Sequence, residues 1–257
     1  MSNEHKLYLR KIKKTNFIVR FFRIAIIVFF LILWEYLSSK NIINSFIFSS
    51  PRKVVSTIIN LYSTHNLFNH IFITIYETLI SFVLGTLMGF IIASILWRFD
   101  IIARILDPYL TVLNSLPKVA LGPIIIIWAG ASMKSIIIMA LLISVIITVI
   151  NIHQSFKEIN ENKIKLLKSF SATKSQIYFK LLLPGSLQNI ISTLKINVSM
   201  SLIGVIMGEF LVSKSGIGYL IMYGSQVFNL SLVITGVALL SLLATIMYYL
   251  ILLFEKK

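Results

Sequence analysis

The sequence contains no cysteine and few charged residues, and both shortages narrow the possible functions. Without cysteine there can be no disulfide framework, no thiolate metal site and no cysteine nucleophile. Charged residues make up 13% of the chain, whereas a soluble domain carries roughly 25%. Hydrophobic residues account for 57% of the 257 residues, and the mean hydropathy is +0.90. The chain is therefore expected to be a membrane protein.

Acidic residues are especially scarce, with 9 against 24 basic ones, which gives a formal net charge of +15. A nucleic-acid binder needs its basic residues on a water-facing surface. Here they gather in short segments between apolar runs, as topology signals do, so no nucleic-acid partner is expected. The sequence has no phosphate-binding loop, no carboxylate pair spaced for acid–base catalysis and no histidines at metal-ligand spacing. We expect no enzymatic activity, no cofactor and no metal.

Six segments are long and apolar enough to cross a bilayer, since a spanning helix needs about 20 mostly apolar residues. They are Phe17–Leu37, Ile71–Trp97, a part of Ile105–Gly130, Ser135–Ile152, a part of Gln188–Val212, and Leu230–Phe254. The predicted fold class is all-α, a polytopic membrane protein whose residues 1–257 form a single transmembrane domain. The first span is expected to be a retained signal-anchor, because no small-residue cleavage site follows the basic N-terminus.

The basic residues also predict the orientation of the spans. With the N-terminus inside the cell, the cytoplasmic segments would hold 17 basic residues and the outside segments only 5. Cytoplasmic loops carry such an excess of Lys and Arg, so both termini are predicted to be cytoplasmic. Residues 50–63 would then lie outside as an amphipathic helix along the membrane. Ser50 suits its N-cap and Pro51 its first helical position.

The third span is interrupted by two prolines and a lysine, Pro117, Lys118 and Pro123. We expect Pro123 to kink the helix, as a proline in a helix interior does. Broken helices at membrane depth are tolerated where they line a cavity, which favours a pathway segment, but a purely structural kink is equally compatible. Lys118 could attract an anion, lie at the interface or pair with Glu77. Glu209 in the fifth span could belong to the pathway or serve as a structural hydrogen-bond acceptor.

Between the fourth and fifth spans, the stretch KLLKSFSATKSQIYFKLLLPGSLQ places four lysines among apolar residues at helical spacing. Asn160 or Asn162 can cap a first short helix. Thr173 and Gln176 form a capping box for a second, which ends where Pro184 opens the next helix. Such a basic amphipathic pair could lie on anionic lipid. Alternatively, its apolar face could dock into a groove on a cytoplasmic protein.

Five stretches of the sequence, in order, resemble the motifs of one protein family. They are SSPRKVVSTI, SFVLGTLMGF, LPKVALGPIIIIWAG, KLLKSFSATKSQIYFKLLLP and GEFLVSKSGIGYLI. Along nearly its whole length the chain resembles the permease subunits of binding-protein-dependent ABC importers. The most similar group is the nitrate/sulfonate/taurine type, which also includes bicarbonate and thiamine-precursor carriers.

The resemblance implies a type I importer permease in the bacterial plasma (inner) membrane. Its expected partners are a second copy of the permease, a pair of subunits that bind the ATP, an extracytoplasmic substrate-binding protein and membrane lipid. The implied substrate is a small molecule, preferably an anion such as a sulfonate, taurine, nitrate or bicarbonate, with a thiamine precursor as the alternative. A membrane-embedded enzyme or scaffold is the alternative from a different class.

In that family the cytoplasmic loop, here within residues 153–184, is the coupling helix that inserts into a cleft on the ATPase. The residues that the resemblance assigns to this contact are Lys165, Leu166, Leu167, Phe170, Ser171, Ala172, Ile177, Leu181, Leu183 and Pro184. The residues expected in the pathway are Pro117, Lys118, Pro123 and Glu209. Three features depart from the family. Residues 165–167 replace its Glu-Ala-Ala, Ser171 its turn glycine, and Glu77 an arginine that is frequent in the second span.

Overall fold

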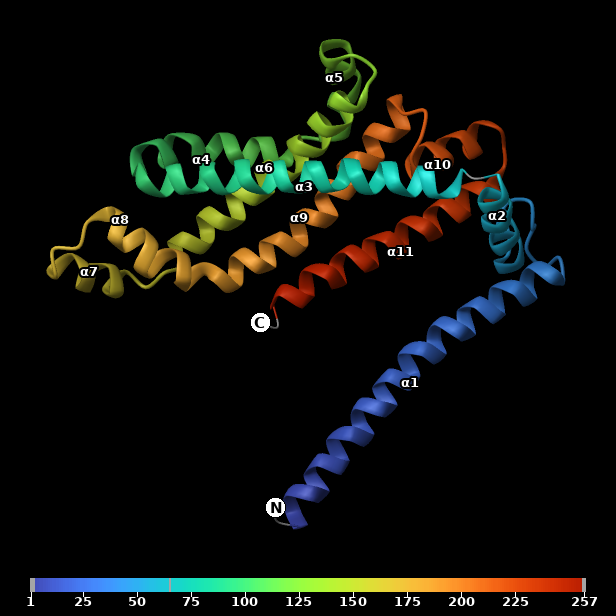
Figure 1. Ribbon diagram of the computed structural model, residues 1–257, viewed down its shortest axis with the longest axis horizontal. Helices are drawn as coiled ribbons and strands as arrows, with labels where there is room; N and C mark the ends of the chain where they lie inside the picture. The colour runs from blue at the N-terminus through green and yellow to red at the C-terminus, as the bar shows by residue number, and fades with distance from the viewer. Residues whose placement is uncertain (1–2, 65, 256–257) are drawn as a thin grey trace.

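The computed structural model describes residues 3–64 and 66–255, and every regular element within them is a helix (Figure 1). His65, Lys256 and Lys257, the last two counted above as cytoplasmic basic residues, lie outside the described residues. The elements are α1 (Asn3–Ser39), α2 (Pro51–Ser63), α3 (Leu67–Arg98), α4 (Asp100–Ser115), η1 (Lys118–Leu121), α5 (Gly122–Ala129), α6 (Met133–Lys157), α7 (Glu161–Ser169), α8 (Lys174–Ile177), η2 (Tyr178–Leu182), α9 (Leu183–Val212), α10 (Ile217–Gln226) and α11 (Leu230–Glu255). The all-α prediction is confirmed.

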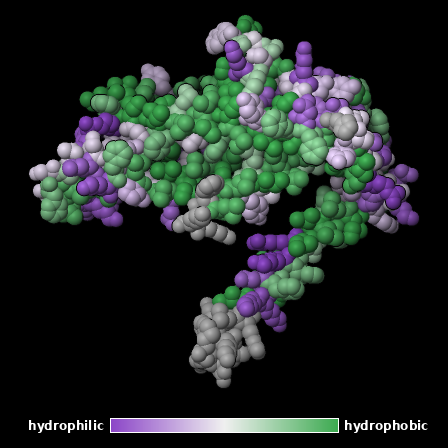
Figure 2. All heavy atoms as spheres, in the orientation of Figure 1, coloured by the Kyte–Doolittle hydropathy of each residue, from purple (hydrophilic) through white to green (hydrophobic). Residues whose placement is uncertain are grey.

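Among the described residues, five helices are long and apolar enough to cross a membrane, namely α1, α3, α6, α11 and the helix that contains α9. The third predicted span is a broken pair, α4 and the η1–α5 segment, bent by 87°. Counting that pair as one span gives the six that were predicted. Hydrophobic residues cover the body of the molecule, and hydrophilic ones gather at the ends near α7 and near α2 (Figure 2).

The break in the third span lies at Pro117 and not at Pro123, which corrects the predicted kink. Leu116 has φ −64° and ψ 138°, the extended conformation that a following proline favours, and α4 ends there. Pro123 lies instead in the first turn of α5. A proline is tolerated in that turn because its absent N–H would have had no helical partner.

The centre of the bundle is formed by α3, α6 and α9, and small residues let these helices approach closely. Gly85 and Gly89 on α3 face the side chains of Ser144 and Thr148 on α6. A Cβ at Gly89 would lie 2.5 Å from the Cβ of Thr148, and a Cβ at Gly208 on α9 would lie 2.8 Å from the backbone of α6. Such small-residue contacts are how membrane helices pack without a hydrophobic driving force between them.

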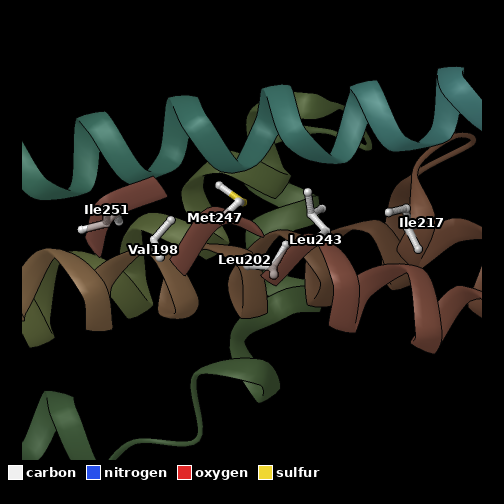
Figure 3. Close-up of a cluster of buried hydrophobic side chains, with 6 residues drawn as sticks. All are labelled: Val198, Leu202, Ile217, Leu243, Met247 and Ile251. Atoms are coloured by element: carbon white, nitrogen blue, oxygen red, sulfur yellow. The ribbon is translucent and has the colours of Figure 1, made fainter. Parts of the chain in front are cut away.

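A cluster of buried apolar side chains joins the last three helices beneath α3 (Figure 3). Val198 and Leu202 come from α9 and Ile217 begins α10, while α11 supplies Leu243, Met247 and Ile251. Partly buried residues of α3, including Phe82, pack against this cluster. The cluster therefore fixes α9, which carries Glu209, against α3.

The first span extends away from the other helices (Figure 1). Its most apolar window is 0% buried in the chain. It is attached at its C-terminal end, where the indole of Trp34 donates to the carbonyl of Phe48 (3.2 Å) and Glu35 accepts from the amide of Arg52 (3.0 Å). The next helix, α2, begins as predicted, with Ser50 as the N-cap and Pro51 in the first turn.

Candidate functional site

The segment assigned to coupling forms the tip of one end of the molecule, where α7 and α8 lie (Figure 1). The side chain of Asn160 accepts from the amide of Asn162 (2.8 Å) and caps α7. The capping box that starts α8 has both of its bonds: the amide of Gln176 donates to the Thr173 hydroxyl (3.3 Å), and the amide of Thr173 donates to Gln176 Oε1 (2.8 Å). The predicted starts of both helices are confirmed.

The turn between these helices has the hydrogen bonds of a Schellman motif. The amide of Ser171 donates to the carbonyl of Lys168 (2.9 Å), and the amide of Ala172 donates to the carbonyl of Leu167 (3.0 Å). Ser171 itself has φ +56°, a left-handed conformation that favours glycine. This geometry suits the turn glycine that the family resemblance leads us to expect at position 171.

The second helix does not end before Pro184, as the sequence had suggested. One continuous helix of 39 residues runs from Lys174 to Val212. Just before the proline, residues Tyr178–Leu182 form a π turn, in which the amide of Leu183 reaches the carbonyl of Tyr178. The wider turn accommodates a proline ring that would otherwise crowd the carbonyl four residues earlier. The second part of the segment assigned to coupling is thereby continuous with the fifth span.

The residues predicted to contact an ATPase divide into exposed and buried groups. Phe170 at the turn is 75% exposed and Leu166 is 57% exposed. Ile177 is 2% exposed, so the structure places it in the core of the chain rather than on the outer face of the tip. Lys165 is exposed and pairs with Glu161 on the same helix (3.6 Å). The remaining residues of the set, all exposed or half-buried, are Leu167, Ser171, Ala172, Leu181, Leu183 and Pro184.

Tyr178 anchors this tip to the membrane-spanning helices. Its hydroxyl lies 2.7 Å from the hydroxyl of Ser94 on α3. Its ring packs on Trp97 of α3 and on Phe156 of α6, with centroids 5.4 and 5.9 Å away. Helical spacing alone places Tyr178 among the apolar positions of the amphipathic helix. Its proximity to the aromatic Trp97 could not be read from local spacing.

A buried polar cluster at the opposite end of the bundle surrounds Glu209, which is 1% exposed. Its Oε1 accepts from the hydroxyl of Thr74 (2.6 Å), and its Oε2 accepts from the amide of Gly218 (2.5 Å). The Thr74 hydroxyl in turn accepts from the amide of Ile217 (2.8 Å), and His70 Nδ1 accepts from the amide of Gly216 (3.0 Å). These contacts favour the structural role considered for Glu209, because they fix the start of α10.

Glu77 completes this cluster and was not among the predicted pathway residues. Glu77 is 3% exposed, and its carboxyl group lies near that of Glu209. Its Oε2 has no partner within the described part of the chain. The spacing of His70, Thr74 and Glu77 at i, i+4 and i+7 was the available sequence signal, since it places all three on one face of α3.

Glu77 also lines a cavity of about 440 Å³ between α3, the turn before α6 and the loop after α9. The other polar lining residues are Tyr76, Ser132, Ser213, Lys214 and Ser215. A concave site of this size with a few convergent polar groups is typical of small-molecule binding. Several polar side chains therefore converge on this cavity.

The cavity is not lined by the three residues of the interrupted third span, Pro117, Lys118 and Pro123. The ammonium of Lys118 donates to the carbonyl of Asn114 (2.9 Å). Within the described residues it forms no ion pair with Glu77, which excludes one of the alternatives considered for it. The η1–α5 segment packs on the bundle near Gly122, where a Cβ would meet the side chain of Leu211 on α9. Lys118 is therefore not part of the cluster around Glu209.

Comparisons with known proteins agree on one family and one fold. Residues 85–257 match the sequence profile of the binding-protein-dependent transport system inner membrane component family. The chain is 27% identical over 189 residues to the formylaminopyrimidine transport permease protein ThiX of Halalkalibacterium halodurans, covering 74% of this chain and 75% of that one. It is 19% identical over 219 residues to the taurine transport system permease protein TauC of Escherichia coli, covering 83% and 80%. A chain of the MetNI methionine ABC transporter in an inward-facing conformation has the same fold, with a TM-score of 0.63 at 19% identity over 74% of this chain and 93% of that one.

Proposed function

The chain belongs to the family of binding-protein-dependent transport system inner membrane components, and from this premise we propose that two copies of it form the path by which a small solute enters a bacterial cell. It is a permease subunit of an ABC importer, a multi-pass protein of the bacterial plasma membrane, and not an enzyme. Family membership implies ATPase and substrate-binding protein partners. Residues 1–257 act in this proposal as one transmembrane domain.

The exposure of Phe170 is the observation that carries the proposed coupling role of residues 153–184. Phe170 is 75% exposed and Leu166, four positions earlier, is 57% exposed, so the tip presents an apolar surface that a groove on a partner protein could cover. The tip is joined through the continuous helix from Lys174 to Val212 to the fifth span. A push on the tip by an ATPase would therefore be transmitted along a rigid element into the membrane.

Two classes of solute are supported by different observations. An anion is supported by Lys118 in the interrupted span and by the similarity to TauC. A thiamine precursor of the aminopyrimidine class is supported by the similarity to ThiX and by Glu77, whose unpartnered oxygen belongs to a residue that lines the cavity. A carboxyl group accepts hydrogen bonds from amino groups, and in its ionised form it repels anions. We favour the aminopyrimidine class, because Glu77 lines the cavity and Lys118 does not.

Two measurements test this proposal at separate levels. A tagged chain purified from its native membrane should retain a subunit with a Walker-motif ATPase, whatever the solute. Cells that depend on this importer should then take up labelled formylaminopyrimidine, and excess taurine should leave that uptake unchanged. Taurine uptake in its place would select the anion class, and purification without any ATPase would contradict the coupling role.

A further inference from the structure

A groove of about 430 Å³ lies between the C-terminal end of α3 and the start of the helix that leads into the fifth span. Its walls are mostly apolar or aromatic and include Phe90, Ile91, Ile95, Trp97, Tyr178 and Phe179. Arg98 and Lys174 also line it. The ammonium of Lys174 donates to the backbone carbonyl of Arg98 (3.4 Å), so the two basic residues are neighbours.

The groove lies at the end of α3 that the excess of basic residues predicts to be cytoplasmic. The apolar span α3 ends at Arg98, and Trp97 is an aromatic residue of the kind enriched at membrane interfaces. From Arg98 back to Ile91 the helix rises about 10 Å, at 1.5 Å per residue. The groove therefore extends from the headgroup region into the hydrocarbon, and its apolar part is long enough for a segment of an acyl chain.

The charge of the groove is of one sign. None of the residues that line it is acidic. Asp100, close by in the sequence, is paired with Arg104 (2.7 Å). Basic pockets between membrane helices on the cytoplasmic side suit anionic lipid headgroups. An apolar channel with two cations at one end is complementary to a molecule with a hydrocarbon tail and an anionic head.

We propose that this groove binds one acidic phospholipid of the cytoplasmic leaflet. The phosphate lies at Arg98 and Lys174, and an acyl chain lies along Ile91, Ile95 and Phe179. Because one wall belongs to α3 and the other to the coupling segment, the bound lipid holds α8 against the span. The proposal does not depend on which solute is transported.

Trp97 lines the groove and provides a direct test. The chain has three tryptophans, so Trp34→Phe combined with Trp128→Phe leaves Trp97 as the only one. This variant is reconstituted in phosphatidylcholine vesicles that contain either dibrominated phosphatidylglycerol or dibrominated phosphatidylcholine at equal mole fraction, because bromine quenches tryptophan on contact. We expect the apparent affinity for phosphatidylglycerol to exceed that for phosphatidylcholine by roughly tenfold, since two basic residues face the headgroup.

Charge-matched variants distinguish a built site from a general surface effect. Arg98→Gln with Lys174→Gln should abolish the preference, whereas Lys163→Gln with Lys168→Gln, which removes two cations from α7, should leave it unchanged. Equal quenching by the two brominated lipids would overturn the proposal in favour of ordinary boundary lipid. No quenching by either would overturn it in favour of a protein covering the groove, such as a second copy of the chain. A preference that persists in the first double variant would also overturn it.

Discussion

The carboxylate of Glu209 on α9 accepts a hydrogen bond of 2.5 Å from the backbone amide of Gly218 on α10. This contact closes the loop of residues 213–216 and supplies a negative group to the N-terminus of α10, where the helix dipole favours it. A buried carboxyl group in a membrane protein is costly unless it is paired. Here the pairing partners are the backbone amide of Gly218 and the hydroxyl of Thr74, so the group stabilises the fold at this end of the bundle.

The glycine that opens α10 should be intolerant of substitution. Gly216 has φ +115°, and a Cβ there would overlap the Glu209 carboxyl group. Gly216→Ala should cost more than the about 1–3 kcal/mol of a strained backbone alone, and should lower the Tm of the purified protein in detergent. Gly130→Ala is the control, because Gly130 has φ +80° with no atom within 4 Å of the added Cβ. Equal losses of Tm in the two variants would show that overlap with the Glu209 carboxyl group adds nothing to the cost of the strained backbone.

Glu77 and Lys118 should have opposite effects on solutes of opposite charge. If the substrate is an aminopyrimidine, Glu77→Gln should lower kcat/KM for uptake by roughly 10–100-fold, since a hydrogen bond to a charged group contributes about 1.5–3 kcal/mol. Lys118→Met should then change uptake little. For an anionic substrate the order is reversed, and Lys118→Met should reduce uptake with assembly and basal ATP hydrolysis intact. The measurement is uptake in vesicles that contain equal amounts of each variant.

Local sequence features were predictable and contacts distant in the chain were not. The capping box of Thr173 and Gln176 and the N-cap at Ser50 were confirmed because a cap requires only neighbouring residues. The third span was placed correctly but its break was not, because either Pro117 or Pro123 could interrupt a helix. Thr74 and Glu209 are 135 positions apart, and only the packing of α3 on α9 brings them together.

In the segment assigned to coupling, too, local features were predictable and distant contacts were not. Phe170 and Ile177 both fit the apolar face of an amphipathic pair, yet one is exposed and the other is in the core. Helical spacing shows which residues share a face but not which neighbour that face meets. The assignment of coupling residues from family resemblance therefore remains a prediction at the exposed positions.

The predicted orientation can be tested with reporter fusions. Fusions at residues 60 and 222 should report the outside, and a fusion at residue 170 should report the cytoplasm, because the excess of Lys and Arg places residues 153–184 inside. Residue 60 lies in α2 and residue 222 in α10, so the two test different outer segments. An outside signal at residue 170 would overturn the orientation and the coupling role together.

Replacing Ser171 by glycine should make the tip more stable. Ser171 has φ +56°, and a non-glycine residue in a left-handed conformation costs about 1 kcal/mol. In Ser171→Gly the amides of the turn should exchange with deuterium more slowly than in the natural protein. Ser171→Ala is the matched control, since it removes the hydroxyl but retains the Cβ. Slower exchange in both variants would attribute the gain to loss of the hydroxyl and not to relief of backbone strain.

The coupling role depends on Phe170 more than on the lysines beside it. If the tip docks into an ATPase groove, Phe170 becomes buried, and truncation of such a residue typically costs more than about 1–2 kcal/mol. Phe170→Ala should therefore weaken retention of the ATPase that co-purifies with the natural chain by roughly tenfold or more. Lys168→Ala should weaken it little, because exposed ion pairs contribute only about 0–1 kcal/mol.

The alternative, in which the tip lies on anionic lipid, predicts the reverse order for these two variants. Loss of Lys168 would then cost about 1 kcal/mol of membrane affinity. Phe170 would have no protein groove to fill, so its truncation would leave ATPase retention unchanged. Pull-down of the ATPase at low and high salt separates the two cases, because screening weakens the lysine contacts and spares apolar burial. Retention that is the same for Phe170→Ala and for the natural chain at both salt concentrations would exclude docking through Phe170.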